Sequence, residues 1–413
     1  MQTESSRLLT PVLALVAMFA TTVHAADFTV TNTSDSGAGS LREAITEAND
    51  SSGLDTIEFA ENVAGTITLV SALPPMVDDV SINGPGAAVL TVSGDDLVRP
   101  FSIAAGVEAS ISGLTVTGGF APESAGEIPG DGGGIRNDGT LAIRNCIVSG
   151  NASSEFGSGG GIYSTGTLLI QGSTIEFNTA DVGAGIASGG TLEVVESTIR
   201  ENAATAIDGG ISNAGTATIR RSLIASNVAE FGGGIGNAAA LVVVNSTISG
   251  NAADGADGLG GGIDNFNGSV ELLHATIARN QAPLGGGVSS DGELVAKNSL
   301  LVENTGGDCE FSAGSFDVFG VNLDTDGSCN NFTAVSSGAL ALQDLADNGG
   351  PTATHAIANA SVAVNAALDC TGLDGITSVA TDQRGVERPR GAACEPGAFE
   401  SDAVDLIFAN GFE

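Results

Sequence analysis

Tryptophan is absent from this 413-residue sequence, and tyrosine and lysine occur once each, at Tyr163 and Lys297. The scarcity of bulky aromatic residues argues against a core of large side chains, and 60 glycines indicate many tight turns. The 49 acidic and 13 basic residues give a formal net charge of −36. Such a chain repels nucleic acid, anionic lipid and anionic polysaccharide, so we expect none of them as partners.

Long hydrophobic runs are also missing, except at the N-terminus. Residues 8–22 are mostly apolar and are followed by Val23-His24-Ala25, a small-x-small pattern. This arrangement is typical of a secretory signal peptide, so we predict that residues 1–25 are removed and that the mature chain begins at Ala26. The alternative is a membrane anchor, but the run is broken by Pro11 and is shorter than the roughly 20 residues that span a bilayer. We therefore expect an exported protein whose mature chain has no membrane span.

Five cysteines are present, and export would permit disulfides. The pairs nearest in sequence are Cys309 with Cys329 and Cys370 with Cys394, although spacing alone leaves other pairings open. Cys146 falls in a column of small residues, which otherwise holds serine or alanine. We expect it to be a buried filler and not a reactive thiol.

A self-similar unit recurs seven times in the middle of the chain. Each unit has a glycine-rich entry that ends at an apolar residue, 24 to 28 residues after the previous one: Ile135, Ile162, Ile186, Ile211, Ile235, Ile263 and Val288. An asparagine follows 16 or 17 residues later: Asn151, Asn178, Asn202, Asn227, Asn251, Asn280 and Asn304. The stretch from this asparagine to the next entry varies between 8 and 12 residues. A half of fixed length and one elastic turn are typical of a solenoid coil.

Apolar columns within the fixed half predict the fold. Two apolar residues spaced by two, such as Leu141 and Ile143, lie on one face of a strand, and a third, such as Val148, follows five residues later. Because side chains alternate between the two faces of a strand, residues five apart on one straight strand would point to opposite faces. Both apolar residues can face the core only if a bend separates two short strands. With a further strand after the glycines, each coil carries about three. The pattern predicts an all-β fold, a right-handed parallel β-helix over residues 61–335. We expect the asparagines to stack as a hydrogen-bonded ladder at a position that tolerates left-handed backbone.

The two ends differ from the repeats. Residues 26–60 read as a strand, a glycine turn and a short amphipathic helix, with Ser40 and Glu43 as a capping box. We expect this segment to cap the open edge of the first coil. Residues 336–400 form a C-terminal cap or anchor-like region, and residues 401–413 form a terminal tail.

These segments carry a family resemblance. Ser40-Leu41-Arg42-Glu43-Ala44 resembles the core of the CSLREA-type N-terminal segment of exported bacterial repeat proteins, with Gly39 in place of the cysteine. The glycine-rich entries and recurring asparagines are similar to the GGAI and FxxN repeats of polymorphic outer membrane proteins, although Val, Ile or Leu usually replaces the Phe. Residues 347–355 and 382–400 resemble a choice-of-anchor Q region, and 405–413 is similar to tails of exported Gram-negative proteins. The resemblance implies a surface or secreted protein and no particular activity.

Candidate catalytic groups are sparse. The position after each entry residue holds Arg136, Tyr163, Ala187, Ser212, Gly236, Asp264 and Ser289. We expect Asp264 to stand alone, so the carboxylate pair of a glycosidase is not apparent. The doublets Asp78-Asp79 and Asp95-Asp96 diverge on a strand. His274 is expected on an exposed turn, and His355 in a structural role.

We predict no catalytic, cofactor-binding or metal-binding residue. Calcium is the one cofactor left open, because Asp254 with Asp257 and Asp324 with Asp326 supply oxygen atoms at short spacing. Neither pair has the terminal glutamate of the twelve-residue calcium loop.

The favoured function is adhesion or interaction by a monomeric, exported surface or secreted β-helix whose ligand is a glycan or a protein. The elastic turns 120–131, 152–160 and 252–261 would present variable loops. The alternative is a divergent carbohydrate-active enzyme, either a glycoside hydrolase or a polysaccharide lyase. A cluster of carboxylates in one groove would favour the enzyme. We expect no cleavage of anionic polysaccharides, because a chain with one lysine has few cations to hold them.

Overall fold

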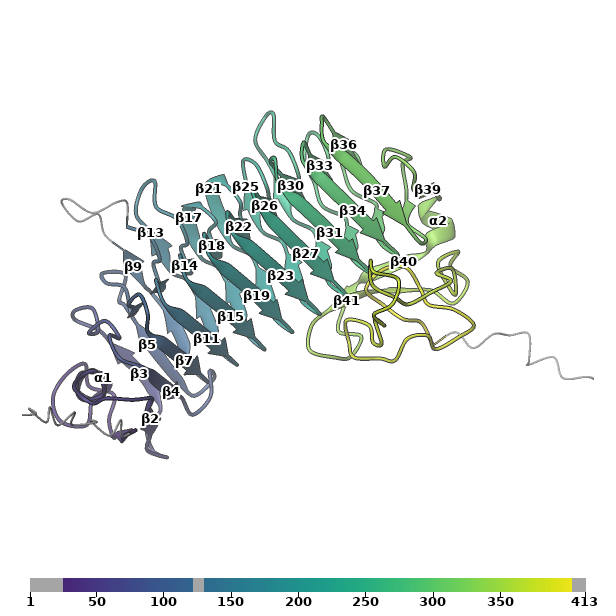
Figure 1. Ribbon diagram of the computed structural model, residues 1–413. Helices are drawn as coiled ribbons and strands as arrows, with labels where there is room; N and C mark the ends of the chain where they lie inside the picture. Colours follow the sequence, from purple (N-terminus) through teal and green to yellow (C-terminus); the bar gives the residue numbers. More distant parts are fainter. Residues whose placement is uncertain (1–24, 122–129, 403–413) are drawn as a thin grey trace, which may run out of the picture.

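A computed structural model describes residues 25–121 and 130–402 of the chain (Figure 1). The predicted signal peptide lies outside the described residues except for Ala25, and the predicted tail lies outside them beyond Asp402. The described residues form a long stack of coils whose strands pair with the same strand of the next coil, in parallel. The predicted all-β parallel β-helix of the right-handed type is therefore confirmed.

Sheet A contains the first strand of the predicted fixed half. Its twelve strands among the described residues are, in order, β1 (Asp27–Val30), β2 (Asp55–Phe59), β4 (Val80–Asn83), β7 (Glu108–Ser112), β11 (Thr140–Arg144), β15 (Thr167–Gln171), β19 (Thr191–Val195), β23 (Thr216–Arg220), β27 (Ala240–Val244), β31 (Ser269–Leu273), β34 (Glu293–Lys297) and β37 (Ser315–Phe319). The register pairs Leu141 with Leu168 and Ile143 with Ile170, so the predicted apolar columns are columns of the structure.

Sheet B contains the second strand of the fixed half. Its twelve strands within the described ranges are β3 (Gly65–Thr68), β5 (Leu90–Ser93), β8 (Thr115–Thr117), β12 (Ile147–Ser149), β16 (Thr174–Glu176), β20 (Thr198–Arg200), β24 (Leu223–Ala225), β28 (Thr247–Ser249), β32 (Thr276–Ala278), β35 (Leu300–Val302), β38 (Leu323–Asp324) and β39 (Thr333–Ala334). The predicted bend between sheets A and B is present. In each of the seven repeat coils this bend has a residue with positive φ: Asn145, Gly172, Glu196, Arg221, Asn245, His274 and Asn298. Gly113 and Gly320 take the same place in the coils on either side.

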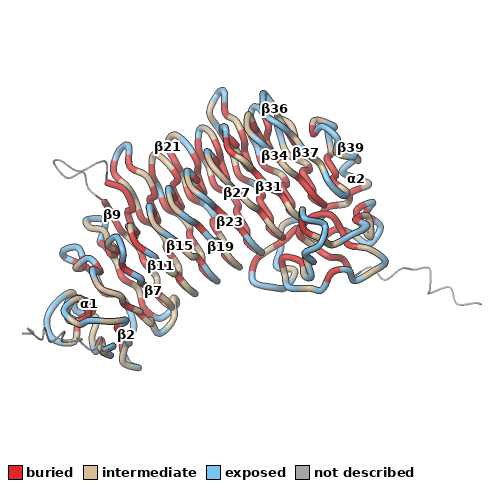
Figure 2. The backbone as a smooth tube through the Cα atoms, viewed as in Figure 1, coloured by how far each residue is buried: buried red, intermediate tan, exposed pale blue. Residues whose placement is uncertain are grey.

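Sheet C contains the strands that follow the glycine-rich entries. Over residues 25–121 and 130–402 it has nine strands: β6 (Phe101–Ile103), β10 (Ile135–Asn137), β14 (Ile162–Ser164), β18 (Ile186–Ser188), β22 (Ile211–Asn213), β26 (Ile235–Asn237), β30 (Ile263–Asn265), β33 (Val288–Ser290) and β36 (Cys309–Phe311). The three sheets enclose one core, in which the entry residues from Ile135 to Val288 are fully buried (Figure 2).

The elastic turns contain short strands that were not predicted. Six of them pair as sheet D within the described part of the chain: β9 (Phe120–Ala121), β13 (Ala152–Ser153), β17 (Thr179–Val182), β21 (Ala203–Ile207), β25 (Val228–Ala229) and β29 (Ala252–Ala253). Every one of these strands except β9 begins directly after a ladder asparagine, so the variable part of each turn lies further along the chain.

The asparagine ladder is confirmed. The Nδ2 atom of Asn202 donates to Oδ1 of Asn227 at 2.9 Å, and Oδ1 of Asn202 accepts from Asn178 in the same way. The prediction that these asparagines occupy the left-handed position is wrong. The residue before each has positive φ instead, as at Phe177 and Glu201, and this turns the asparagine side chain into the core.

The N-terminal helix packs against the first coil. Helix α1 (Leu41–Asp50) buries Leu41, Ala44, Ile45 and Ala48 in the same core as β1 and β2. The Ser40 hydroxyl accepts from the Glu43 amide at 3.2 Å, as predicted, whereas the Glu43 carboxylate accepts from the Gly39 amide at 2.5 Å. No helix in the described ranges is long and apolar enough to cross a bilayer.

The C-terminal segment, residues 336–402, contains α2 (Ser337–Leu340) and the antiparallel strands β40 (Leu342–Ala346) and β41 (Thr354–Ile357). It folds back along the flank of the last coils, where it appears yellow in Figure 1. Leu340 and Ile357 share an apolar cluster with Leu300 and Val302 of β35. The segment therefore covers the outer face of sheet B at this end of the stack.

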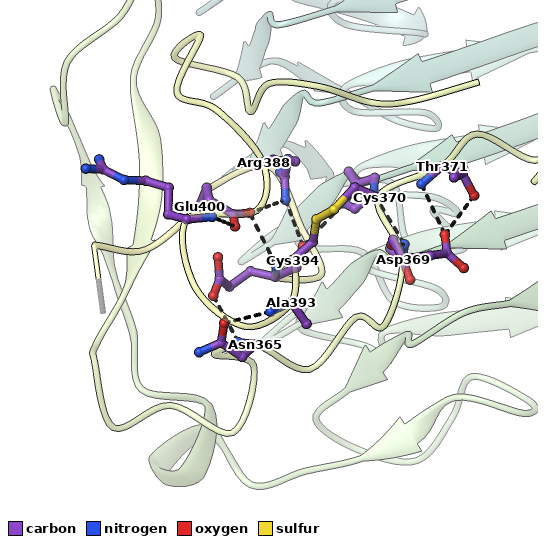
Figure 3. The surroundings of a disulfide bond; sticks show 12 residues. Asn365, Asp369, Cys370, Thr371, Arg388, Ala393, Cys394 and Glu400 are labelled. Atoms are coloured by element: carbon purple, nitrogen blue, oxygen red, sulfur yellow. Dashed lines mark hydrogen bonds and ion pairs between the residues drawn. A yellow bond between two sulfur atoms is a disulfide. The ribbon is translucent and has the colours of Figure 1, made fainter. Parts of the chain in front are cut away.

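Both expected disulfides are present, Cys309–Cys329 and Cys370–Cys394. The second lies within the C-terminal segment, close to the ion pair between Arg388 and Glu400 at 2.8 Å (Figure 3). Cys146 is free and 2% exposed, and burial raises the pKa of its thiol to about 11. The predicted burial of Cys146 is confirmed, and its lack of reactivity stays a prediction.

Candidate functional site

The outer face of sheet C has polar and charged side chains that do not repeat from coil to coil. The middle residue of each strand points away from the core, and the register aligns these residues in one column: Ser102, Arg136, Tyr163, Ala187, Ser212, Gly236, Asp264, Ser289 and Glu310. Ala187 and Ser289 are only 5% and 7% exposed although they face outward. Neighbouring groups therefore cover these two outward-facing residues.

Asp208 interrupts a column of left-handed glycines beside this face. Three residues before the entry residue, six coils have a glycine with positive φ: Gly132, Gly159, Gly183, Gly232, Gly260 and Gly285. Asp208 takes that place in the seventh coil, with φ +65°. Aspartate tolerates this conformation better than most residues but less well than glycine, and such strain is concentrated at functional sites.

Gly236 provides the space for the Asp208 side chain. A Cβ atom added at Gly236 would lie 1.7 Å from Oδ1 of Asp208, so no other residue fits without a rearrangement. Gly236 lies between Ser212 and Asp264 in the column. Asp208 thus occupies a place where other coils have glycine, and Gly236 occupies a place where most other coils have a side chain. The carboxyl group of Asp208 fills the space over Gly236, on the outer face of sheet C.

The two carboxyl groups influence one another. Burial raises the pKa of Asp208 to about 7, a hydrogen bond from Ser212 opposes this shift, and Asp264 adds to it. Burial also raises the pKa of Asp264 to about 6, opposed by Ser289 and reinforced by Asp291. The expectation that Asp264 stands alone is therefore wrong. One coil spacing, about 4.8 Å, separates the backbones of Gly236 and Asp264. The carboxyl group of Asp208 lies over Gly236, so the two acids are neighbours along the face.

An aromatic ring and a cation lie on the same face. The Arg136 guanidinium is 5.6 Å from the centre of the Tyr163 ring, and its Nε donates to Asp138 at 2.8 Å. Tyr163 is three coils from Gly236, or about 14 Å at the usual coil spacing. We call Arg136, Tyr163, Asp208, Ser212 and Asp264 the sheet C site.

The other sequence candidates lie elsewhere. The Asp79 carboxylate accepts from the amide of Glu108, and Asp95 and Asp96 both have positive φ in a turn. Neither doublet joins the sheet C site.

The expectation of an exposed His274 is wrong. The side chain is fully buried under the C-terminal segment, where Nδ1 lies 3.2 Å from the carbonyl oxygen of Glu395. Burial and the nearby Arg388 lower its pKa, so the ring is neutral. His355 is also buried, with Nε2 at 2.8 Å from the Ser249 hydroxyl, in a structural contact.

The calcium candidates are not brought together. Asp254 and Asp257 are exposed in an elastic turn, whereas Asp324 is buried and accepts from the amide of Cys329. Asp326 accepts from Ser328 and from the amide of Asp308. No group of three or more His, Cys, Asp or Glu side chains in the described ranges could hold a metal ion. Calcium binding therefore stays a prediction.

The fold thus defines a class, the parallel β-helix proteins. No protein-family model matches the chain, and no curated protein matches it. Among solved structures, the crystal structure of pectate lyase Pel9A is similar, with a TM-score of 0.48 and 15% identity over 92% of this chain and 97% of that chain. A likeness of this extent carries no argument about activity, so the fold rests on the strand pairing above. The CSLREA-type, anchor and outer membrane protein resemblances stay predictions.

Proposed function

We propose that the protein is an exported surface or secreted β-helix that binds a neutral glycan at the sheet C site. The observation that carries this proposal is the pairing of Asp208, at a position where other coils have glycine, with Gly236, whose missing side chain leaves room for it. This pairing places a nearly buried carboxyl group on the outward face of sheet C. Carboxyl and hydroxyl groups recognise sugar hydroxyls by hydrogen bonds, and the Tyr163 ring offers a flat apolar surface. Sites of this kind combine apolar area with a few convergent polar groups.

The charge of the chain selects a neutral ligand. The net charge is −36, and the single lysine is 5% exposed and pairs with Asp369 at 2.9 Å. Asp369 is labelled in Figure 3. Arg136 is already bonded to Asp138. The sheet C site therefore has little cationic charge with which to hold a polyanion.

Export and the family resemblance belong to the same proposal. The signal-like N-terminus supports secretion, and the two disulfides are typical of proteins that fold outside the cytoplasm. A CSLREA-type N-terminal segment and an anchor-like C-terminal segment would suit a monomeric surface protein.

A second candidate function is hydrolysis of that glycan, favoured by the raised pKa values of the carboxyl pair. Asp208, whose pKa is raised to about 7, would donate a proton to the glycosidic oxygen as the C–O bond breaks. Asp264 would act on the opposite side, either as base toward water or as nucleophile. Carboxyl groups roughly 5 to 9.5 Å apart serve these roles in glycosidases.

One screen tests both functions. The wild-type protein, the Asp264→Asn variant and the control Asp317→Asn, whose exposed carboxylate lies on β37, are incubated with neutral and anionic polysaccharides. We expect retention on a neutral glycan by the wild type and the control, at least tenfold weaker retention by Asp264→Asn, and no turnover of a polyanion with or without calcium. Release of reducing ends by the wild type and the control, but not by Asp264→Asn, would establish hydrolysis. Equal retention by all three proteins would contradict the proposed site.

A further inference from the structure

A buried carboxylate lies beside the predicted processing site. Asp55, the first residue of β2, is fully buried. Its Oδ1 accepts from the backbone amide of Ala26 at 2.7 Å and from the Ser51 hydroxyl at 3.3 Å. Its Oδ2 is also buried and has no hydrogen-bond partner among the described residues. A buried carboxylate with one unpaired oxygen is costly unless a cation compensates it.

The backbone holds Ala26 firmly at this carboxylate. The carbonyl oxygen of Ala26 accepts from the amide of Thr56 at 2.8 Å, and Asp27 pairs with Thr56 at the start of sheet A. The nitrogen of Ala26 is therefore positioned by the first rung of the sheet, whereas Ala25 is exposed. In the uncleaved chain this nitrogen is an amide with a single hydrogen, which is directed at Oδ1.

We propose that cleavage after Ala25 completes this site, because the new α-ammonium group of Ala26 forms a buried ion pair with Asp55. A peptidase adds water across the Ala25–Ala26 amide, which leaves a carboxylate on Ala25 and a protonated amine on Ala26. The ammonium carries three hydrogens, so it can satisfy Oδ2 as well as Oδ1. The mature N-terminus thus becomes the cation that the buried carboxylate lacks. This inference rests on the proposed export, but its chemistry can be tested without export.

The test measures how fast the N-terminal amine is acylated. Three chains are released from a fusion partner without extra residues: one begins at Ala26, one at Ala25, and one at Ala26 with Asp55→Asn. The control begins at Ala26 and has Asp27→Asn, which removes an exposed carboxylate next to the terminus. Each is acylated at pH 7, folded and in urea, and the N-terminal peptide is quantified by mass spectrometry.

We expect the folded Ala26 chain and its Asp27→Asn control to react about tenfold more slowly than in urea, since an ion pair that raises the amine pKa by about one unit has this effect. The Ala25 chain and Asp55→Asn should react within about twofold of their rates in urea. Equal rates for the folded Ala26 and Ala25 chains would overturn the proposal, even if Asp55→Asn does not fold. N-terminal sequencing of the exported protein is a separate test. If the exported chain begins at a residue other than Ala26, export does not form the ion pair with Asp55, whatever the acylation rates show.

Discussion

At the scale of single residues, the sheet C site depends on two matched departures from the repeat. Asp208 replaces a glycine that six other coils have at a left-handed position, and Gly236 replaces a side chain that would occupy the same space. Both departures are visible in the aligned repeats. The repeats do not reveal that the two departures are connected, because the connection depends on the direction in which a left-handed residue projects its side chain. Sequence reasoning therefore found Asp264 and missed its neighbour.

The raised pKa of Asp208 predicts a pH-dependent stability. Its pKa in the folded protein, about 7, is above the ordinary value of 3.8, so the folded state keeps a proton that the unfolded chain loses. The stabilisation is complete below about pH 4 and is lost as the pH rises to about 7. The free energy of unfolding should fall by a few kcal/mol over this range, at about 1.4 kcal/mol per pKa unit. Thermal unfolding of the wild type should show this as a Tm that decreases from pH 4 to pH 7.

Asp208→Asn tests the origin of that pH dependence. Asparagine tolerates the left-handed backbone and does not ionise, so the fall in Tm between pH 4 and pH 7 should be clearly smaller in this variant. Asp264 retains part of the effect because its own pKa is raised. The exposed Asp317→Asn should behave as the wild type does. The same slope in Asp208→Asn and the wild type would show that Asp208 is not the titrating group.

At the scale of elements, the coils are held together by repeated side-chain columns. The asparagine ladder, the buried serines and the apolar columns all follow the fixed half of the unit, and each was readable because its spacing is constant. The short strands of sheet D were not readable, since they lie in the elastic turn, where length varies. Four of the six have only two residues, which is too few for a periodic signal.

The ladder predicts a large effect for one central substitution. Asn202→Ala removes bonds to Asn178, Asn227 and the carbonyl oxygen of Ile175, and leaves buried partners unsatisfied. The free energy of unfolding, measured by urea denaturation, should fall by roughly 2–4 kcal/mol. The matched control is Asn330→Ala, whose side chain is exposed and whose effect should stay below about 0.5 kcal/mol.

The elastic turn after β29 should accept extra residues. Four Gly/Ser residues inserted between Ala256 and Asp257, both exposed, should change the Tm little, because loop closure costs about 0.6 kcal/mol per doubling of length. By contrast, Ile248→Asp places a charge in the fully buried column of sheet B and should prevent folding. Circular dichroism distinguishes the two outcomes, and similar damage from both changes would mean that turn and core are misassigned.

At the scale of the whole molecule, the C-terminal segment covers the outer face of sheet B at one end of the stack. The C-terminal segment packs on the outer face of sheet B through Leu340 and Ile357 and buries Arg388 with Glu400. Its packing could not be predicted, because this segment has no period and its partners are distant in sequence, in some cases by more than 100 residues, as for Ser249 and His355. On the outer face of sheet C, Asp264 is half-buried and Asp208 is nearly buried.

The most direct test of the central claim compares glycan binding by the wild type and by Asp208→Gly. Glycine restores the regular column and removes both the backbone strain and the buried carboxyl group, so the variant should unfold at a higher temperature. Titration calorimetry with the neutral glycan retained in the screen should nevertheless show binding weakened at least tenfold. Undiminished binding by the stabilised variant would contradict the account, because Asp208 would then have no part in recognising the ligand.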